Sequence, residues 1–182
     1  HIELELIDAF LRSMEMDLHE NVYDQAGYEE YIYGSAEAVG LMCLRVFCEG
    51  DNTKYESLKE SARSLGSAFQ KVNFLRDLKS DFDDRGRVYF PGVDFTHFTA
   101  QEKQKIEDDI RADFDNDYTG IVRIPDCTLF SVYLEYVYYL NLLKKIKQSP
   151  AERVAEERIR VNDGRKMMLL FSSAVRNSLN LL

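Results

Sequence analysis

The sequence predicts an all-α protein with a single domain spanning residues 1–182. Apolar residues recur at helical spacing along the chain, and no alternating strand pattern outlasts them. Two Thr-x-x-Glu capping boxes and a Ser-Pro pair mark helix starts, and the chain has only three prolines. With 45% hydrophobic and 30% charged residues, the 182-residue chain suits one globular domain with a substantial core.

The composition excludes several classes of protein. A formal net charge of −9 argues against a nucleic-acid partner bound through a broad basic surface. No apolar run reaches transmembrane length, and no signal-peptide pattern opens the chain. Cys43, Cys48 and Cys127 are odd in number and lie in apolar helical patterns. We therefore expect buried, reduced thiols in a cytoplasmic protein, not a disulfide framework or a zinc site.

Residues 2–20 are predicted to form an amphipathic helix. Its apolar side chains follow one another at four-residue steps: Ile2, Leu6, Phe10, Met14 and Leu18. Asp8 and Asp17 lie nine residues apart and form no carboxylate pair. We interpret both as solvated.

Residues 25–49 are predicted to form a second helix. Tyr31, Ser35, Ala38 and Met42 share one of its faces. Gly34 and Gly40 each cost a helix about 1 kcal/mol relative to alanine, so their presence indicates close packing against the backbone. A tight helix–helix contact and a ligand channel are both compatible with this pattern.

A long third helix is predicted to begin at the Thr53–Glu56 capping box and to end at Gly86. At about 100° per residue, its polar side chains form one narrow stripe walled on both sides by large apolar residues. The stripe consists of Gln70, Asn73, Asp77 and Asp81. An ordinary solvated face lies opposite the apolar face, so this stripe indicates a helix that lines a wet or metal-filled cavity.

The chemistry of the stripe suits a hard cation. Carboxylates four residues apart, here Asp77 and Asp81, repel each other and need a counter-charge when they are partly buried. Mg²⁺ takes one or two protein carboxylates and completes its shell with water and phosphate oxygens. The stripe is therefore a candidate diphosphate-binding wall. The alternative from spacing alone is a solvated acidic face that continues to Asp83 and Asp84.

Two arginines lie at the end of this helix and just beyond it. Arg85 and Arg87 could fold back onto phosphate oxygens or cap the helix by pairing with Asp83 and Asp84.

A second capping box, at Thr99, opens a helix through about residue 118. Asp109 and Asp113, and Asp113 and Asp117, repeat the Asp-x-x-x-Asp spacing among many charged neighbours. We interpret these acids as solvated surface.

The last third of the chain is also helical. Residues 126–147 begin at Asp126 as the N-cap, and their aromatic and leucine positions cover more than one face, so core packing or an apolar ligand tunnel explains them. A helical turn follows Ser149 and Pro150. Residues 153–166 hold the main basic concentration, which could approach anionic lipid or diphosphate, although we favour a solvated, salt-bridged segment. Residues 166–182 form a final amphipathic helix.

Two of these segments resemble the squalene/phytoene synthase family. Residues 65–91 match its long signature Leu-Gly-x-Ala-x-Gln-x-x-Asn-x-Leu-Arg-Asp-x-x-x-Asp, followed by Arg-Gly-Arg-x-Tyr-x-Pro. Residues 31–40 are similar to its Tyr-x-Tyr-x-x-Ala-Gly-x-Val-Gly segment. The later helices are compatible with the family, so the resemblance spans nearly all of the chain and is nearest to bacterial phytoene synthases.

The resemblance implies a helical prenyl-synthase fold around a central cavity and a transferase reaction. Two prenyl diphosphates, most simply geranylgeranyl diphosphate giving phytoene in carotenoid biosynthesis, condense head to head with loss of pyrophosphate. Mg²⁺ is the implied cofactor, with Mn²⁺ as an alternative, and no Gly-rich turn signals NADPH. The lipid substrates imply peripheral membrane contact.

The resemblance also assigns residues. Asn73, Asp77 and Asp81 match metal and diphosphate positions. Tyr31 and Gln70 match polar cavity positions that would act beside the two aspartates. Arg76, Arg85 and Arg87 match signature positions whose implied role is phosphate pairing or loop structure.

Two departures from the family pattern stand out. Glu37 replaces a glycine, which puts the local backbone packing in doubt. Residues 1–30 contain no Asp-x-x-x-Asp pair, whereas the family has a first aspartate-rich helix ahead of the matched part. Since the chain also starts at His1, we expect an N-terminally truncated piece, inactive alone. Squalene or dehydrosqualene synthase is the runner-up, and a non-catalytic helical assembly protein of the same fold is the remaining alternative.

Overall fold

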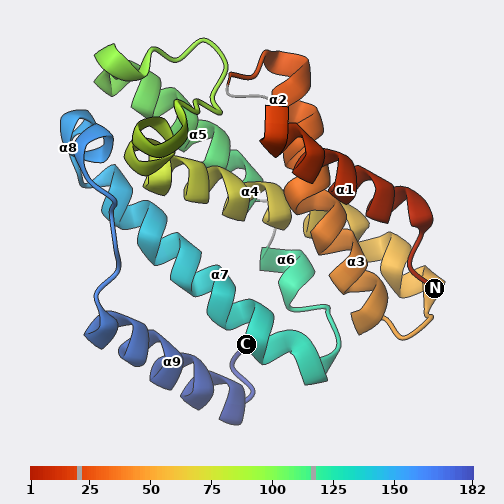
Figure 1. The fold of residues 1–182 in the computed structure, drawn as a ribbon. Helices are drawn as coiled ribbons and strands as arrows, with labels where there is room; N and C mark the ends of the chain where they lie inside the picture. Colours follow the sequence, from red (N-terminus) through yellow and green to blue (C-terminus); the bar gives the residue numbers. More distant parts are fainter. Residues whose placement is uncertain (20–21, 116–117) are drawn as a thin grey trace.

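The computed structural model describes residues 1–19, 22–115 and 118–182, and this part of the chain is helical without any β-strand. The elements in order are α1 (Leu4–His19), α2 (Gln25–Ile32), a π-helical turn (Tyr33–Glu37), α3 (Ala38–Phe47), α4 (Asn52–Arg85), a 3₁₀ turn (Phe95–His97), α5 (Ala100–Asp115), α6 (Tyr118–Ile121), α7 (Asp126–Lys147), α8 (Ala151–Glu156) and α9 (Asp163–Ser178). The prediction of an all-α fold is confirmed (Figure 1).

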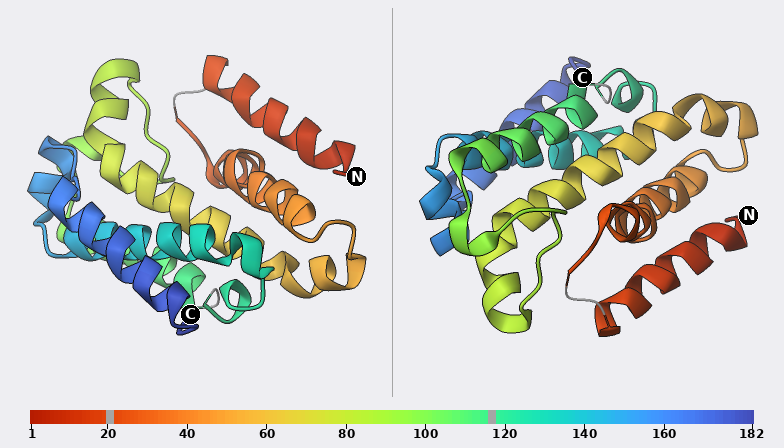
Figure 2. Two further views of the ribbon diagram at one scale, coloured as in Figure 1. Left: turned by 90° about the horizontal axis from the view of Figure 1, so that it is seen from below. Right: turned by 90° about the horizontal axis from the view of Figure 1, so that it is seen from above.

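Helix α4, 34 residues long, is the element around which the others pack. It contacts the π-helical turn, α3, α5, α6, α7 and α8, whereas α9 packs on α7 and α1 packs on the π-helical turn, α2 and α3. Figure 2 shows α1 and α9 on opposite sides of α4. A polar stripe on α4 therefore lies in the middle of the molecule.

The helix boundaries test the predicted caps. Thr99 and Glu102 form the predicted reciprocal capping box, with backbone N–H to side-chain distances of 2.8 and 3.2 Å. Gly86 ends α4 with φ 64°, in the left-handed region that glycine adopts readily.

Two predicted caps are wrong by one or two residues. Asp51, not Thr53, caps α4, because its Oδ1 accepts the Lys54 N–H at 2.9 Å. Asp126 is the first residue of α7 and follows Pro125 at the N-cap, where its carboxylate still faces the positive end of the helix dipole.

The predicted second helix is divided by the π-helical turn, and two of its glycines lie at close contacts with other helices. A Cβ on Gly34 would lie 2.3 Å from the Ala9 carbonyl oxygen of α1. A Cβ on Gly40 would lie 2.7 Å from the Ala62 carbonyl oxygen of α4. Close helix packing is therefore confirmed at both glycines, and Gly40 also lines a cavity described below.

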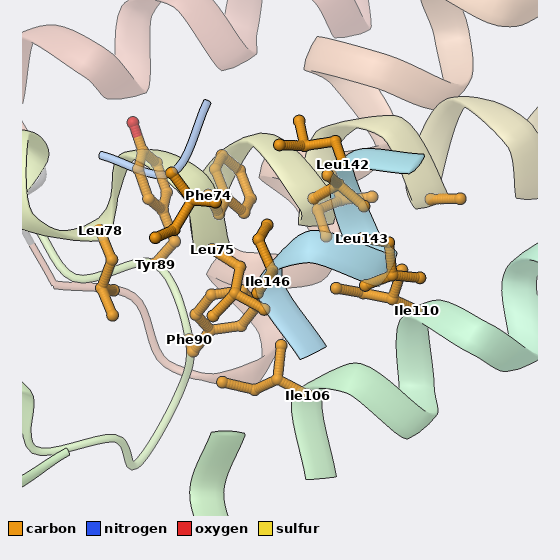
Figure 3. Close-up of a cluster of buried hydrophobic side chains, with 14 of the residues drawn as sticks. Phe74, Leu75, Leu78, Tyr89, Phe90, Ile106, Ile110, Leu142, Leu143 and Ile146 are labelled. Atoms are coloured by element: carbon orange, nitrogen blue, oxygen red, sulfur yellow. The ribbon is translucent and has the colours of Figure 1, made fainter. Parts of the chain in front are cut away.

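One side of α4 is anchored in the main apolar core. Phe74, Leu75 and Leu78 of α4 meet side chains of the following loop, α5 and α7 there (Figure 3). The Phe74 ring stacks on Tyr89, with centroids 3.8 Å apart and planes 7° from parallel. Because these side chains fix the rotation of α4, they also fix the direction in which its polar stripe points.

The structure tests the prediction of three buried cysteine thiols. Cys48 is buried, but Cys43 and Cys127 are exposed, so the prediction of three buried thiols is wrong for two of them. All three are free thiols.

Among the residues that the structure describes, no helix is both long and apolar enough to cross a bilayer.

Candidate functional site

The polar stripe of α4 faces other helices instead of open solvent. Its members Gln70, Asn73, Asp77 and Asp81 are all half-buried. The Gln70 side-chain amide donates to Ser35 Oγ of the π-helical turn at 3.3 Å. The Tyr139 hydroxyl of α7 donates to Asn73 Oδ1 at 3.1 Å. The first half of the stripe is therefore held between the π-helical turn and α7.

Asp77 is surrounded by positive charge. Arg76 Nε donates to Asp77 Oδ1 at 2.9 Å, and Arg158 Nε lies 2.6 Å from the same oxygen. Arg158 belongs to the non-helical segment between α8 and α9. The prediction of a solvated, salt-bridged segment for residues 153–166 agrees with the exposed Arg153–Glu157 pair. Arg158 also forms a salt bridge, but with the half-buried Asp77 of the stripe.

A second polar cluster lies around Tyr31. This tyrosine is buried, and its hydroxyl donates to Asp17 Oδ2 at 3.2 Å. Burial raises the pKa of the Tyr31 hydroxyl, and the nearby Tyr89 and Asp17 raise it further. Tyr31 is therefore a protonated donor over the whole physiological pH range.

Arg87 lies in the same cluster. Its guanidinium is buried and donates to Asp17 Oδ1 and to the Asp17 carbonyl, both at 2.8 Å, and to the Tyr89 hydroxyl at 3.1 Å. Arg87 therefore ties the loop after α4 to α1 and does not cap the helix through Asp83 and Asp84. The Arg85 side chain lies outside the described residues.

Asp17 is a residue that sequence reasoning missed. The interpretation of Asp17 as solvated is wrong, since the carboxylate pairs with a buried guanidinium. The signal was present in the helical periodicity: at about 100° per residue, Asp17 falls on the same face as Leu6 and Ser13, which are both buried. An acid in the middle of a buried face needs a partner.

The donor set of the stripe fits one kind of metal ion. An amide oxygen and two carboxylates on one helix face suit a hard cation that takes few protein ligands and completes its shell with water and phosphate. The described residues contain no group of three or more His, Cys, Asp or Glu that could hold a metal by themselves. Asn73, Asp77 and Asp81 thus fit Mg²⁺ carried with a diphosphate, and not a metal enclosed by protein alone.

An apolar cavity of about 310 Å³ begins beside Gln70. Its walls come from the π-helical turn, α3, α4, α6 and α7, and its lining on α4 runs from Leu58 to Gln70. Leu58 and Gln70 lie twelve residues apart, about 18 Å along the helix axis, so the lining follows this stretch of α4. Gly40 and Gly66 line it where helices pack closely, and Phe47 adds a large apolar side chain. Gln70 stands where this cavity meets the polar stripe.

The second Asp-x-x-x-Asp pair has a different partner. Lys71 Nζ lies 2.6 Å from Asp109 Oδ2 and 2.9 Å from Asp113 Oδ2, and the Ser67 hydroxyl donates to Asp113 at 2.9 Å. Burial by itself would lower the pKa of Lys71, but its bonds to the two aspartates outweigh burial and raise it. The interpretation as solvated surface is wrong for Asp113, which is partly buried, whereas Asp109 is exposed although it also helps to join α5 to α4. Asp117 lies outside the described residues.

Comparison with known proteins places these observations in context. A model of the squalene/phytoene synthase family matches residues 1–165. Phytoene synthase 1 of Solanum lycopersicum is 25% identical over 93% of this chain and 45% of its own length. The 4,4'-diapophytoene synthase of Staphylococcus haemolyticus is 29% identical over 56% of this chain and 34% of its own length.

The fold has a solved counterpart. The crystal structure of squalene synthase HpnC from Alicyclobacillus acidocaldarius superposes with a TM-score of 0.67 at 20% identity, over 80% of this chain and 60% of that chain. The chain therefore spans less than half of the two curated relatives named here and 60% of the solved structure.

Proposed function

The chain belongs to the squalene/phytoene synthase family, and on that premise we propose that it supplies part of a site for head-to-head condensation of two prenyl diphosphates. The observation that carries the proposal is the meeting of two environments at Gln70. On one side lies an elongated apolar cavity, and on the other the acidic stripe of α4. A prenyl diphosphate has the same division between an apolar chain and an anionic head.

The acidic end of the site would bind the diphosphate with its cation. Asn73, Asp77 and Asp81 are the residues that would hold Mg²⁺, or Mn²⁺ as the alternative. When bound, the ion neutralises the pyrophosphate that leaves as the carbon–oxygen bond breaks. Gln70 would orient the head group at the mouth of the cavity, and Arg76 would add positive charge beside it.

The apolar end would protect the reaction from water. An allylic cation formed beside Gln70 would face the mostly apolar side chains that line the cavity in place of bulk water. The buried Tyr31 remains in the proposal as a protonated hydroxyl, although it is bonded to Asp17 and does not line this cavity. Arg87 is assigned to loop structure, because its contacts bind the loop to α1.

The first candidate reaction is condensation of geranylgeranyl diphosphate to phytoene. The phytoene synthases among the relatives support it. The second candidate, squalene or dehydrosqualene formation from farnesyl diphosphate, is supported by the diapophytoene synthase relative. Retention of Asn73, Asp77 and Asp81 argues against a non-catalytic assembly role.

Product analysis tests the proposal. The protein, together with any residues that its gene encodes ahead of His1, is incubated with Mg²⁺ and either geranylgeranyl or farnesyl diphosphate, and the extracted lipids are weighed by mass spectrometry. A forty-carbon triene supports phytoene synthesis, and thirty-carbon products support the second candidate. The proposed enzymatic function is refuted if neither substrate gives a product and Asp77→Asn binds pyrophosphate in the presence of Mg²⁺ as tightly as the parent does.

A further inference from the structure

Both carboxylate oxygens of Asp77 are in contact with arginine. Besides the 2.6 Å contact to Oδ1, Arg158 Nη2 lies 3.4 Å from Oδ2. Arg76 also contacts both oxygens from the neighbouring position in the sequence. The oxygens that would coordinate a cation therefore already have positive partners.

The two arginines differ in their freedom to move. Arg76 is part of α4, and its side chain is only 18% exposed. Arg158 lies in the non-helical segment between α8 and α9, and its side chain is 44% exposed. The neighbouring Ile159 and Val161 are buried, at 2% and 5% exposure. The backbone of the segment is thus anchored in the core, while the half-exposed Arg158 side chain reaches Asp77.

This arrangement has opposite consequences for a bare cation and for a cation bound to diphosphate. A guanidinium beside Asp77 repels an incoming divalent cation and occupies lone pairs that the cation needs. A diphosphate offers the same guanidinium a stronger, bidentate partner. The arrival of the anion would therefore free Asp77 at the moment when the cation needs it.

We propose that Arg158 is a diphosphate ligand that rests on Asp77 in the ligand-free protein and transfers to the phosphate oxygens when the diphosphate binds. The inference rests on the proposed function, since it takes Asp77 as a cation ligand. In this proposal, residues 157–162 bring the positive charge of Arg158 to the polar stripe of α4. As a result, the cation and the diphosphate bind cooperatively.

Arg158→Gln tests the exchange, because it removes the guanidinium charge and keeps a polar, unbranched side chain. Titration calorimetry measures two affinities, that of Mg²⁺ alone and that of inorganic pyrophosphate in saturating Mg²⁺. We expect the affinity for Mg²⁺ alone to rise about threefold and that for pyrophosphate to fall at least about tenfold. Arg158→Lys, which keeps the charge, should recover part of the pyrophosphate affinity. A merely structural role would not move the two affinities in opposite directions.

Lys79→Gln is the matched control. It removes one positive charge from α4, the helix that carries Asp77, where Lys79 pairs with Asp83 at 2.7 Å, and should change neither affinity. If Arg158→Gln lowers both affinities or leaves both unchanged while Asp77→Asn abolishes binding, the exchange is wrong and the cation site stands. If the parent protein binds no pyrophosphate in the presence of Mg²⁺, both the exchange and the proposed function are wrong.

Discussion

Within the described residues, the Asp77–Asp81 pair of α4 and the Asp109–Asp113 pair of α5 share one spacing and differ in what neutralises them. Asp109 and Asp113 on α5 share Lys71, a buried lysine of α4 that lies between both carboxylates. On α4, Asp77 is paired with Arg76 and with Arg158, which comes from a half-exposed, non-helical segment. Lys71 is buried between α4 and α5, so its ion pairs hold the two helices together. Arg158 reaches Asp77 from the surface, so a ligand can take its place.

Removal of Lys71 should have the largest effect on stability. Lys71→Met leaves the partly buried Asp113 and the exposed Asp109 without their partner, and we expect the free energy of unfolding to fall by about 2 kcal/mol. Urea denaturation followed by circular dichroism measures it. The control is Lys79→Met, whose exposed partner Asp83 should make the change smaller than about 0.5 kcal/mol. Equal losses in the two variants would contradict the distinction between a buried joint and a surface pair.

Asparagine substitutions in the two pairs should separate binding from stability. Asp77→Asn should weaken Mg²⁺-dependent pyrophosphate binding at least tenfold, about 1.4 kcal/mol, because it removes a charged oxygen ligand. Asp113→Asn should leave that affinity unchanged and lower the free energy of unfolding by about 1 kcal/mol, because it weakens the bond to Lys71. Calorimetry and urea denaturation on both variants complete the comparison. Loss of affinity in Asp113→Asn would show that the α5 pair also takes part in binding.

High pH should weaken the α5 joint. The pKa of Lys71 is raised above its ordinary value of 10.5, so its contribution is fully present below that pH and is lost as pH rises through the raised value. The difference in unfolding free energy between the parent and Lys71→Met should therefore shrink above about pH 10.5. Denaturation series across this range measure it. In Lys71→Arg, which stays charged, the difference from Lys71→Met should persist.

The smallest expected effect concerns the hydroxyl that holds Asn73. Tyr139→Phe removes its 3.1 Å hydrogen bond to Asn73 and should lower the free energy of unfolding by about 0.5–1 kcal/mol. Thermal denaturation measures the change. Tyr138→Phe, on the neighbouring residue of α7, is the control. A larger loss in the control would mean that the ring position, and not the bond to Asn73, matters.

Sequence rules that act over a few residues were enough to place most of the helices, although not all of their caps. The Thr99 capping box and the left-handed Gly86 act within a few residues, so the sequence reveals them directly. The rotation of α4 was also predictable, because its apolar side chains must enter the core. The long signature in residues 65–91 pointed to the family that the comparison confirmed.

The sequence by itself determined an all-α chain, its family and a polar stripe on one face of α4. Only the tertiary structure decided which positive charge meets which carboxylate. Lys71 meets the α5 pair, Arg158 meets Asp77, and Arg87 meets Asp17. These partners are far apart along the chain and come together only because the helices pack as they do. Ion pairing depends on distance and burial, which spacing along a single helix does not contain.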